Sequence, residues 1–186
     1  MTKRIHDMPP QEQGHLFPIY LTENKPHWKQ WYSAESKFLQ ERLPNITRIS
    51  HMGSTSIGSI WAKPIIDILV EIPQTINLQD YKKHILSSGY AHVLSTDTRI
   101  YFNKGYTANG FADRVFHLHL RHSGDNGELY FRDYLIDHPQ VAKEYEQMKL
   151  KLWKQYEHDR DGYTNAKAEF VLRHTELAKR LYKNRY

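Results

Sequence analysis

A turn of small residues followed by a carboxylate in an apolar run is the part of this sequence best suited to chemistry. The turn reads Gly53-Ser54-Thr55, and Asp67 follows within the run PIIDILVEI at 64–72. Backbone N–H groups in such a turn, together with the hydroxyl groups, can hold a phosphate. A carboxylate inside an apolar strand is costly to bury without a partner. We therefore expect the turn to bind phosphate, and Asp67 to be a metal ligand and the catalytic residue.

Each half of this motif also has a plain structural interpretation. Gly53 and Gly58 have the spacing of a nucleotide-binding P-loop, but Ser59-Ile60 stands where that motif has lysine and a hydroxyl residue, which excludes it. A small-residue turn is also typical of an ordinary connection between a strand and a helix. The carboxylate of Asp67 could instead form a salt bridge. The candidate partners are Lys63, Arg121 and Arg132.

Two histidines separated by one residue form the second candidate group. In the segment VFHLHLRH at 115–122, His117 and His119 face the same side of a strand. Two imidazoles and the carboxylate of Asp67 can together bind one divalent ion. The alternative is that both imidazoles hydrogen-bond to backbone or tyrosine groups. Imidazoles more than about 8 Å from Asp67 would exclude a shared ion, because metal–ligand bonds are about 2 Å long.

Other charged residues complete the predicted site. Lys63 and Arg132 are candidate phosphate contacts, and the guanidinium of Arg132 could bind in bidentate fashion. Lys63 could equally be a solvated lysine in a turn, and Arg132 could form an ion pair with Asp133. Glu71 is a candidate metal ligand on the face of Asp67, although it lies about 13 Å further along the strand. Mg²⁺ or another divalent ion is the expected cofactor.

The spacing of apolar residues predicts the elements that position these groups. Alternation at 64–72 predicts a strand with two faces, one with Ile66, Ile68, Val70 and Ile72 and the other with Asp67, Leu69 and Glu71. The other predicted elements are helices at 25–43 and 77–88, a short edge strand at 15–21, strands at 46–52, 90–94, 99–103 and 115–122, and helices from 129 onward. Residues 105–110 are expected to be a flexible loop, and residues 1–14 a flexible N-terminal tail. The sum is one α+β domain over 15–186 with a helical C-terminal third.

The composition of the chain limits the classes of ligand and partner that we expect. The chain has 186 residues, a formal net charge of +5 and no cysteine, which excludes disulfides and thiolate metal sites. A basic balance favours phosphorylated ligands. No run of apolar residues reaches the roughly 20 that a membrane-spanning helix needs. We expect a cytoplasmic protein and neither a membrane nor a nucleic acid as partner, because no stretch interleaves basic and aromatic residues.

The Gly-Ser turn with an acidic residue on the next strand is similar to the signature of the nucleotidyltransferase fold. Enzymes of that fold usually carry two carboxylates two residues apart and hold divalent ions that bridge a nucleotide triphosphate. This chain has Leu69 at the position two after Asp67, which departs from that pattern.

A closer resemblance covers most of the chain. The blocks HMGSTSIGSIWAKPIIDILVEI at 51–72, HLHL at 117–120 and FRDYLIDHP at 131–139 are similar to the GrpB family in order and spacing. Tyr145 with Lys149 and Tyr163 with Lys167 fit as well, and Ile57-Gly58 is a small departure in the turn. The resemblance implies a nucleotidyltransferase-like mixed β-sheet with flanking helices, and some family members are fused to dephospho-CoA kinase.

Two functions follow as expectations. The first is a metal-dependent nucleotidyltransferase-like protein that binds a nucleotide or phosphorylated ligand and transfers a nucleotidyl group to an acceptor. The second is a non-catalytic nucleotide- or coenzyme-binding module of the same fold, which Leu69 favours. The number of carboxylates and imidazoles within reach of one metal ion discriminates between them.

Overall fold

The computed structural model describes residues 8–186. In this part of the chain, five strands form one mixed sheet in the order β1-β2-β5-β4-β3. The strands are β1 (Arg48–Met52), β2 (Ile65–Ile72), β3 (Ala91–Ser95), β4 (Arg99–Thr107) and β5 (Gly110–His122). The central strands β2 and β5 pair in parallel, and the other neighbours are antiparallel. The sheet and its order confirm the predicted α+β class.

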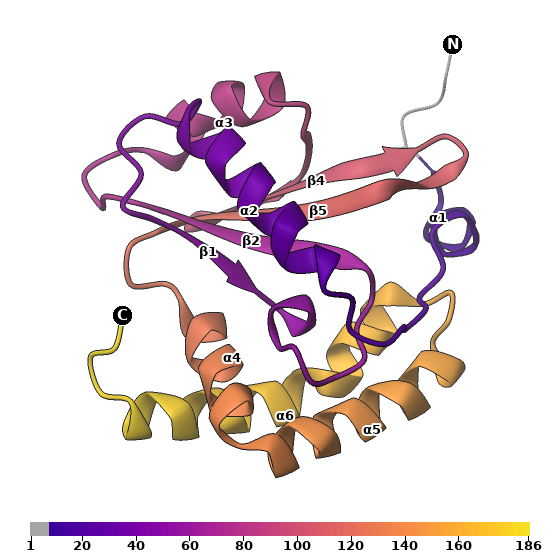
Figure 1. Cartoon of the computed structure of the whole chain (residues 1–186). Helices are drawn as coiled ribbons and strands as arrows, with labels where there is room; N and C mark the ends of the chain where they lie inside the picture. The colour runs from indigo at the N-terminus through magenta and orange to yellow at the C-terminus, as the bar shows by residue number, and fades with distance from the viewer. Residues whose placement is uncertain (1–7) are drawn as a thin grey trace.

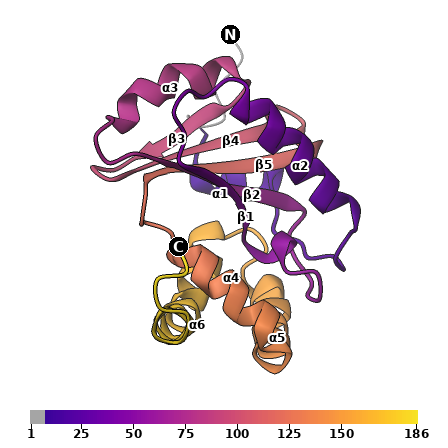
Figure 2. The same cartoon turned by 60° about the vertical axis from the view of Figure 1, so that its left-hand side comes forward.

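Helices lie on both sides of this sheet. They are α1 (Pro10–Leu16), α2 (His27–Gln40), α3 (Leu78–Ser87), α4 (Gly127–Asp137), α5 (Pro139–Gln155) and α6 (Arg160–Leu181), and a single 3₁₀ turn, η2 (Ser54–Ser56), follows β1. Figures 1 and 2 show α2 and α3 on one face and the group α4, α5 and α6 on the other. None of the helices in the described residues is both long enough and apolar enough to span a membrane.

The alternation in β2 fixes which side of the sheet carries chemistry. Ile66, Ile68 and Val70 pack into the core beneath α2 and α3. Leu69, on the opposite face, packs with Met52 and with Leu129 of α4. The predicted division of β2 into two faces is therefore confirmed, and Asp67 points to the side of α4, α5 and α6.

The predicted edge strand at 15–21 is wrong. Helix α1 ends at Leu16, and the chain then runs without regular structure, although Phe17, Ile19 and Leu21 are buried. The backbone N–H of Ile19 donates to the carbonyl of Glu157 instead of to a strand. Every second side chain in this segment is buried because it packs against other elements. The sequence pattern is therefore that of a strand, although the backbone forms no strand hydrogen bonds.

The predicted flexible loop at 105–110 is also wrong, because β4 and β5 form a tight hairpin there. The strands extend to Thr107 and from Gly110, which pair with one another. Gly105 and Gly110 have φ of 92° and 105°. Both glycines therefore supply backbone angles that a bulge and a tight turn require, and they do not mark mobility.

The predicted N-terminal tail lies only partly in the described residues. Residues 1–7 fall outside them. From Pro10 the chain forms α1, which the sequence did not predict, and its Gly14 is buried. A Cβ atom at Gly14 would lie 2.0 Å from the carbonyl oxygen of His158, so the absence of a side chain lets α1 approach the start of α6.

Candidate functional site

Parallel pairing of β2 and β5 brings the predicted metal ligands together. Asp67 is the register partner of His117, and Leu69 is the partner of His119. His117 Nδ1 lies 3.2 Å and His119 Nε2 lies 3.7 Å from Asp67 Oδ1. One potential ligand atom from each of the three residues lies within 4.8 Å of the others. We call these residues the Asp–His cluster; their convergence agrees with the sequence, and their metal-binding role stays a prediction.

The donor set of the Asp–His cluster suits a divalent ion of the transition series. Imidazole nitrogen with one carboxylate fits Mn²⁺, Fe²⁺, Co²⁺, Ni²⁺ or Zn²⁺, whereas Mg²⁺ prefers oxygen ligands. The residues therefore fit a metal ion, although they fit Mg²⁺ poorly.

Protonation states in the cluster favour metal binding. Burial raises the pKa of Asp67, but hydrogen bonds from His117 and His119 outweigh it and hold this pKa well below its usual range. Burial lowers the pKa of His117. Asp67 is therefore ionised and His117 is neutral at physiological pH, which are the forms that bind metals.

Gly53 allows the turn to lie directly against Asp67. Its φ is 70°, and a Cβ atom there would lie 2.4 Å from Asp67 Oδ2. The prediction that the turn lies beside Asp67 is confirmed. The element that follows is only the single 3₁₀ turn η2, so little helix dipole is available to attract a phosphate.

The hydroxyl groups of the turn are used differently from one another. The Thr55 side chain is buried, and its hydroxyl donates to the carbonyl of Ile65 at 3.1 Å and lies 3.0 Å from His51 Nε2. The structure therefore does not support a phosphate contact by the Thr55 hydroxyl. Ser54 Oγ accepts a hydrogen bond of 3.1 Å from Lys149 Nζ and lines the adjoining cavity.

A cavity of about 380 Å³ lies between the sheet and the helices α4, α5 and α6. The Asp–His cluster lines it, together with three lysines, Lys63, Lys149 and Lys167. We call this cavity the lysine pocket. Lys149 is 2% exposed, and Lys167 Nζ lies 4.1 Å from the ring centre of Tyr163. Three lysines around one cavity, beside a candidate metal site, are a lining that is chemically suited to a phosphorylated ligand.

Burial lowers the pKa values of these three lysines. It lowers the pKa of Lys63 and of Lys149 to about 7, and the pKa of Lys167 to about 8. The positive charge of Lys167 lowers the pKa of both Lys63 and Lys149 further, and the charge of Lys63 also lowers that of Lys149. An anionic ligand in the pocket would favour the charged form of all three lysines.

The sequence analysis did not assign Lys149 and Lys167 to the site. In α5 and α6 alike, a tyrosine precedes the lysine by four residues, as Tyr145–Lys149 and Tyr163–Lys167. Residues four apart share one helix face, and each of these lysines lies over the ring of its tyrosine. This repeated spacing was the signal in the sequence that could have identified both lysines.

Arg132 lines the lysine pocket, but its guanidinium is already bonded to protein groups. Nη1 donates to the carbonyl of His51 at 2.7 Å, Nε donates to Asp133 at 2.7 Å, and Nη2 donates to the hydroxyl of Tyr186 at 2.6 Å. The alternative prediction of an Arg132–Asp133 ion pair is confirmed. A bidentate phosphate clamp by Arg132 is not available in this arrangement.

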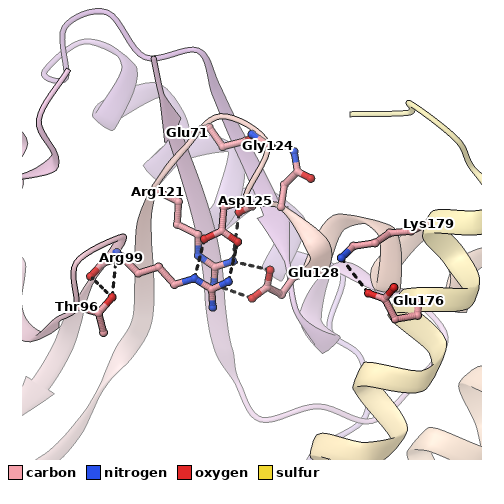
Figure 3. A network of polar contacts seen from close by, with 10 residues as sticks. Glu71, Thr96, Arg99, Arg121, Gly124, Asp125, Glu128, Glu176 and Lys179 are labelled. Carbon is pink, nitrogen blue, oxygen red and sulfur yellow. Dashed lines mark hydrogen bonds and ion pairs between the residues drawn. The ribbon is translucent and has the colours of Figure 1, made fainter. Parts of the chain in front are cut away.

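Glu71 does not join the cluster. It is fully buried, pairs with Arg48 at 3.0 Å, and accepts hydrogen bonds from the backbone of Gly124 and from Asn126. Figure 3 shows Glu71 in a polar network around the loop that joins β5 to α4. The prediction of Glu71 as a metal ligand is therefore not supported, because distance along β2 separates it from Asp67.

The proposed salt bridges of Asp67 are not formed either. Arg121 pairs with Glu128 through two hydrogen bonds of 2.7 and 2.6 Å, and Arg132 pairs with Asp133. In the described part of the chain, the two histidines lie beside the Asp67 carboxylate in place of these partners.

A second, larger cavity adjoins the same cluster. Its volume is about 790 Å³, and Lys63, His117, His119 and Thr164 line both cavities. Its remaining lining comes from α1, β3, β4 and the first turn of α6 and includes Tyr101, Tyr106 and Arg160. We call it the tyrosine cavity.

Comparison with solved structures identifies the fold. The crystal structure of conserved protein GrpB from Enterococcus faecalis is similar with a TM-score of 0.75 and 26% identity, over 88% of this chain and 99% of that chain. A structure of the Cid1 poly(U) polymerase bound to Mg and 3′-dATP is similar with a TM-score of 0.52 and 11% identity, over 84% of this chain and 51% of that chain. The sheet and its helices thus have a nucleotidyltransferase-like fold.

Sequence comparison gives the family. UPF0157 protein YqkA of Bacillus subtilis is 34% identical over 182 residues, 92% of this chain and 51% of that protein, so the chain spans about half the length of this relative. Glutamate-rich protein GrpB of Alkalihalophilus pseudofirmus is 34% identical over 160 residues, 82% of this chain and 91% of that protein. Residues 18–177 match the family described as GrpB protein. The chain therefore belongs to the GrpB family.

Proposed function

We propose that this protein binds a nucleotide or another phosphorylated small molecule beside a divalent metal ion and transfers a nucleotidyl group to an acceptor. The observation that carries the proposal is that the Asp–His cluster and three lysines line the same pocket. A metal ligand set and a group of cations around one cavity match the two requirements of phosphoryl chemistry, which are charge neutralisation and fixed orientation.

Each group of residues has a distinct role. Lys149, hydrogen-bonded to Ser54, and Lys167 would hold phosphate oxygens, and Lys63 lines the same pocket. The Asp–His cluster would hold the ion. When bound, a divalent ion polarises a phosphoryl oxygen and neutralises its charge. The buried lysines would stabilise the charge that develops on the phosphate, because electrostatic interactions are strong in a water-poor site.

A second function, binding without catalysis, is favoured by one observation. Leu69 is fully buried between Met52 and Leu129, and Glu71 is committed to Arg48. The candidate ion therefore has a single carboxylate ligand, whereas two-metal transfer requires several. This observation supports a nucleotide- or coenzyme-binding module as the competing proposal.

Binding is tested by isothermal titration with Mn²⁺ and Co²⁺, with Mg²⁺ for comparison, and then with nucleoside triphosphates and coenzyme A in the presence of the metal. We expect Mn²⁺ or Co²⁺ to bind more tightly than Mg²⁺, and Asp67→Asn to abolish metal binding. Glu71→Gln is the matched control on the same strand face and should retain it, provided circular dichroism shows that it is folded. A wild type that binds none of these metals would contradict the proposed metal site.

Catalysis is tested separately from binding. Pyrophosphate release from each nucleoside triphosphate is measured with metal and a panel of hydroxyl and amine acceptors. Release that depends on the metal and disappears in Asp67→Asn would support nucleotidyl transfer. Tight nucleotide binding with no release under any condition would instead favour the binding module.

A further inference from the structure

The hydroxyl of Tyr106 links the Asp–His cluster to helix α6. It lies 2.8 Å from His117 Nε2, the ring nitrogen opposite the one that faces Asp67. The guanidinium of Arg160, in the first turn of α6, donates to the same hydroxyl. The rings of Tyr106 and His117 are nearly parallel, at an angle of 22° with centres 5.9 Å apart. An unbroken chain of polar contacts therefore runs from β2 through β5 and β4 to α6.

A β-bulge places Tyr106 in this position. Asn103 pairs with His117, and three residues further along a regular strand a side chain would point to the opposite face. The register shifts between Lys104 and Tyr106, which restores Tyr106 to the face of His117. Bulges next to functional sites often redirect a side chain in this way.

Gly105 makes the bulge possible. Its φ is 92°, and a Cβ atom there would lie 2.2 Å from the carbonyl oxygen of Arg114. Both the backbone angle and the close approach require glycine. Gly105 thus interrupts the regular strand directly before Tyr106, where the bulge brings the tyrosine hydroxyl to His117.

We infer that Tyr106 and Arg160 are positioning residues for the metal centre, which fix the ring of His117 so that its Nδ1 faces the ion. The inference rests on the proposed function, because it concerns the same metal site. It assigns to these two residues a role that neither the sequence pattern nor the family match assigns.

The hydrogen-bonding properties of the three groups support this role. A nitrogen that binds a metal carries no proton, so the proton of His117 must then lie on Nε2 and needs an acceptor. The Tyr106 hydroxyl has two lone pairs, and Arg160 can only donate, so it occupies one of them and leaves the other for Nε2–H. Without the ion, Nδ1–H donates to Asp67 and the Tyr106 hydroxyl donates to Nε2. The tyrosine hydroxyl can accept from Nε2–H in the metal-bound state and donate to Nε2 in the metal-free state, whereas phenylalanine can do neither.

The experiment measures Co²⁺ affinity by the visible absorption of the bound ion, with chelator competition for tight binding. We expect Tyr106→Phe to weaken Co²⁺ binding by about 10–100-fold and to change the absorption spectrum, as loss of an outer-shell partner does. Arg160→Gln should weaken Co²⁺ binding to a smaller extent than Tyr106→Phe. Arg160→Lys keeps a charged donor and should therefore bind Co²⁺ more tightly than Arg160→Gln.

Tyr101→Phe is the matched control. Tyr101 lies on the same strand and its ring contacts the other histidine, His119, edge to face at 5.2 Å. Its hydroxyl has no part in the chain from Asp67 to Arg160, so we expect Co²⁺ affinity within about twofold of the wild type. A similar loss in both tyrosine variants would indicate general disturbance of the sheet and would overturn the inference.

A second measurement reports the role of Tyr106 without metal. Nitrogen-15 chemical shifts of the His117 ring give its tautomer, and we expect Nδ1–H in the metal-free wild type and a mixture in Tyr106→Phe. Unchanged tautomer and unchanged Co²⁺ affinity in Tyr106→Phe would overturn the inference while leaving the metal site intact. A wild type that fails to bind Co²⁺ at all would overturn the proposed metal site, and with it the inference.

Discussion

Gly53 is the residue that lets the turn at 53–55 and the carboxylate of Asp67 occupy neighbouring space. Its positive φ and the 2.4 Å approach of Asp67 Oδ2 to the position of a Cβ atom leave no room for a side chain. Both histidines face the same oxygen of Asp67, Oδ1, with His117 Nδ1 at 3.2 Å and His119 Nε2 at 3.7 Å. Any shift of this carboxylate would therefore change both distances together.

Gly53→Ala should lower the free energy of unfolding by about 1–3 kcal/mol through backbone strain and weaken Co²⁺ binding by displacing Asp67. Gly58→Ala is the matched control in the same loop, because nothing lies within 4 Å of its added Cβ atom; we expect a change below about 0.5 kcal/mol. Urea denaturation and Co²⁺ titration measure both effects. Equal stability of the two variants would contradict the argument from close approach.

The lysines predict a pH dependence for ligand binding. Burial lowers the pKa of Lys149 to about 7 from its usual 10.5, so above about pH 7 the free protein carries a neutral Lys149 that an anion must re-protonate. The affinity for ADP should fall between about pH 7.5 and 9.5, where the phosphate group itself is fully ionised. Titration calorimetry in two buffers at about pH 8 should show proton uptake. A pH-independent affinity over this range would count against the lysine pocket as the phosphate site.

The same lysines set the sign of a stability change. Between the folded pKa of about 7 and the unfolded pKa near 10.5, the unfolded chain binds more protons at Lys149 than the folded chain does. The contribution of Lys149 to the free energy of unfolding of the ligand-free protein therefore increases as pH rises through this window. Lys149→Met should remove that contribution, which urea denaturation at several pH values can measure.

At the scale of elements, the loop between β5 and α4 is anchored by Glu71. Glu71 pairs with Arg48 and accepts from Gly124 and Asn126, while Arg121 pairs with Glu128 at the start of α4 (Figure 3). The carboxylate that sequence suggested for metal binding instead joins the sheet to the helical third of the chain.

Glu71→Ala should lower the free energy of unfolding by about 2–4 kcal/mol, because buried donors lose their acceptor and Arg48 loses its partner. Co²⁺ affinity should stay unchanged. Gln74→Ala is the control, since exposed Gln74 also bonds this loop, donating to the carbonyl of Ser123, and should change stability by less than about 0.5 kcal/mol. Loss of Co²⁺ binding in a folded Glu71→Ala variant would return Glu71 to the metal site.

Elements with a strong period were predictable from the sequence, and those shaped by tertiary contacts were not. Alternation in β2 gave the correct faces, because one side of that strand lies in the core. The segment at 15–21 alternates equally well, yet its burial comes from packing that the local pattern does not encode. At 105–110 the glycines supply special backbone angles, which sequence alone does not distinguish from flexibility.

The candidate site was also predictable only where a local sequence pattern determines it. Alternation placed His117 and His119 on one face, and the register of β2 and β5 then brought them to Asp67. Thr55 and Arg132 have suitable chemistry, but internal hydrogen bonds already use their polar atoms. The repeated tyrosine–lysine spacing marks Lys149 and Lys167 as a matched pair, but only the packing of α5 and α6 beneath the sheet brings them to Asp67.

At the scale of the whole molecule, the lysine pocket lies between two layers. Its lining comes from the sheet on one side and from α4, α5 and α6 on the other, and Figure 2 shows these layers facing one another. A ligand in the pocket contacts both, so its binding should hold them together.

Hydrogen exchange can test this arrangement. ADP with Mn²⁺ should slow amide exchange at residues 53–56 and in the first half of α6, because both line the pocket. Helix α3 lies on the opposite face of the sheet (Figure 2) and is the internal control, with unchanged exchange expected. Slower exchange confined to α3 or to the edge strand β3 would place the ligand elsewhere.

The two cavities share a wall made of Lys63, His117, His119 and Thr164, and a thermodynamic consequence follows. An occupant of the tyrosine cavity that alters the positions of these side chains must change the affinity of the lysine pocket for its own occupant. Linkage requires the reverse effect to have the same magnitude. A ligand in one cavity therefore acts as an effector of ligand binding in the other. Two ligands that prefer the same orientation of His117 raise each other's affinity, and two that prefer different orientations lower it.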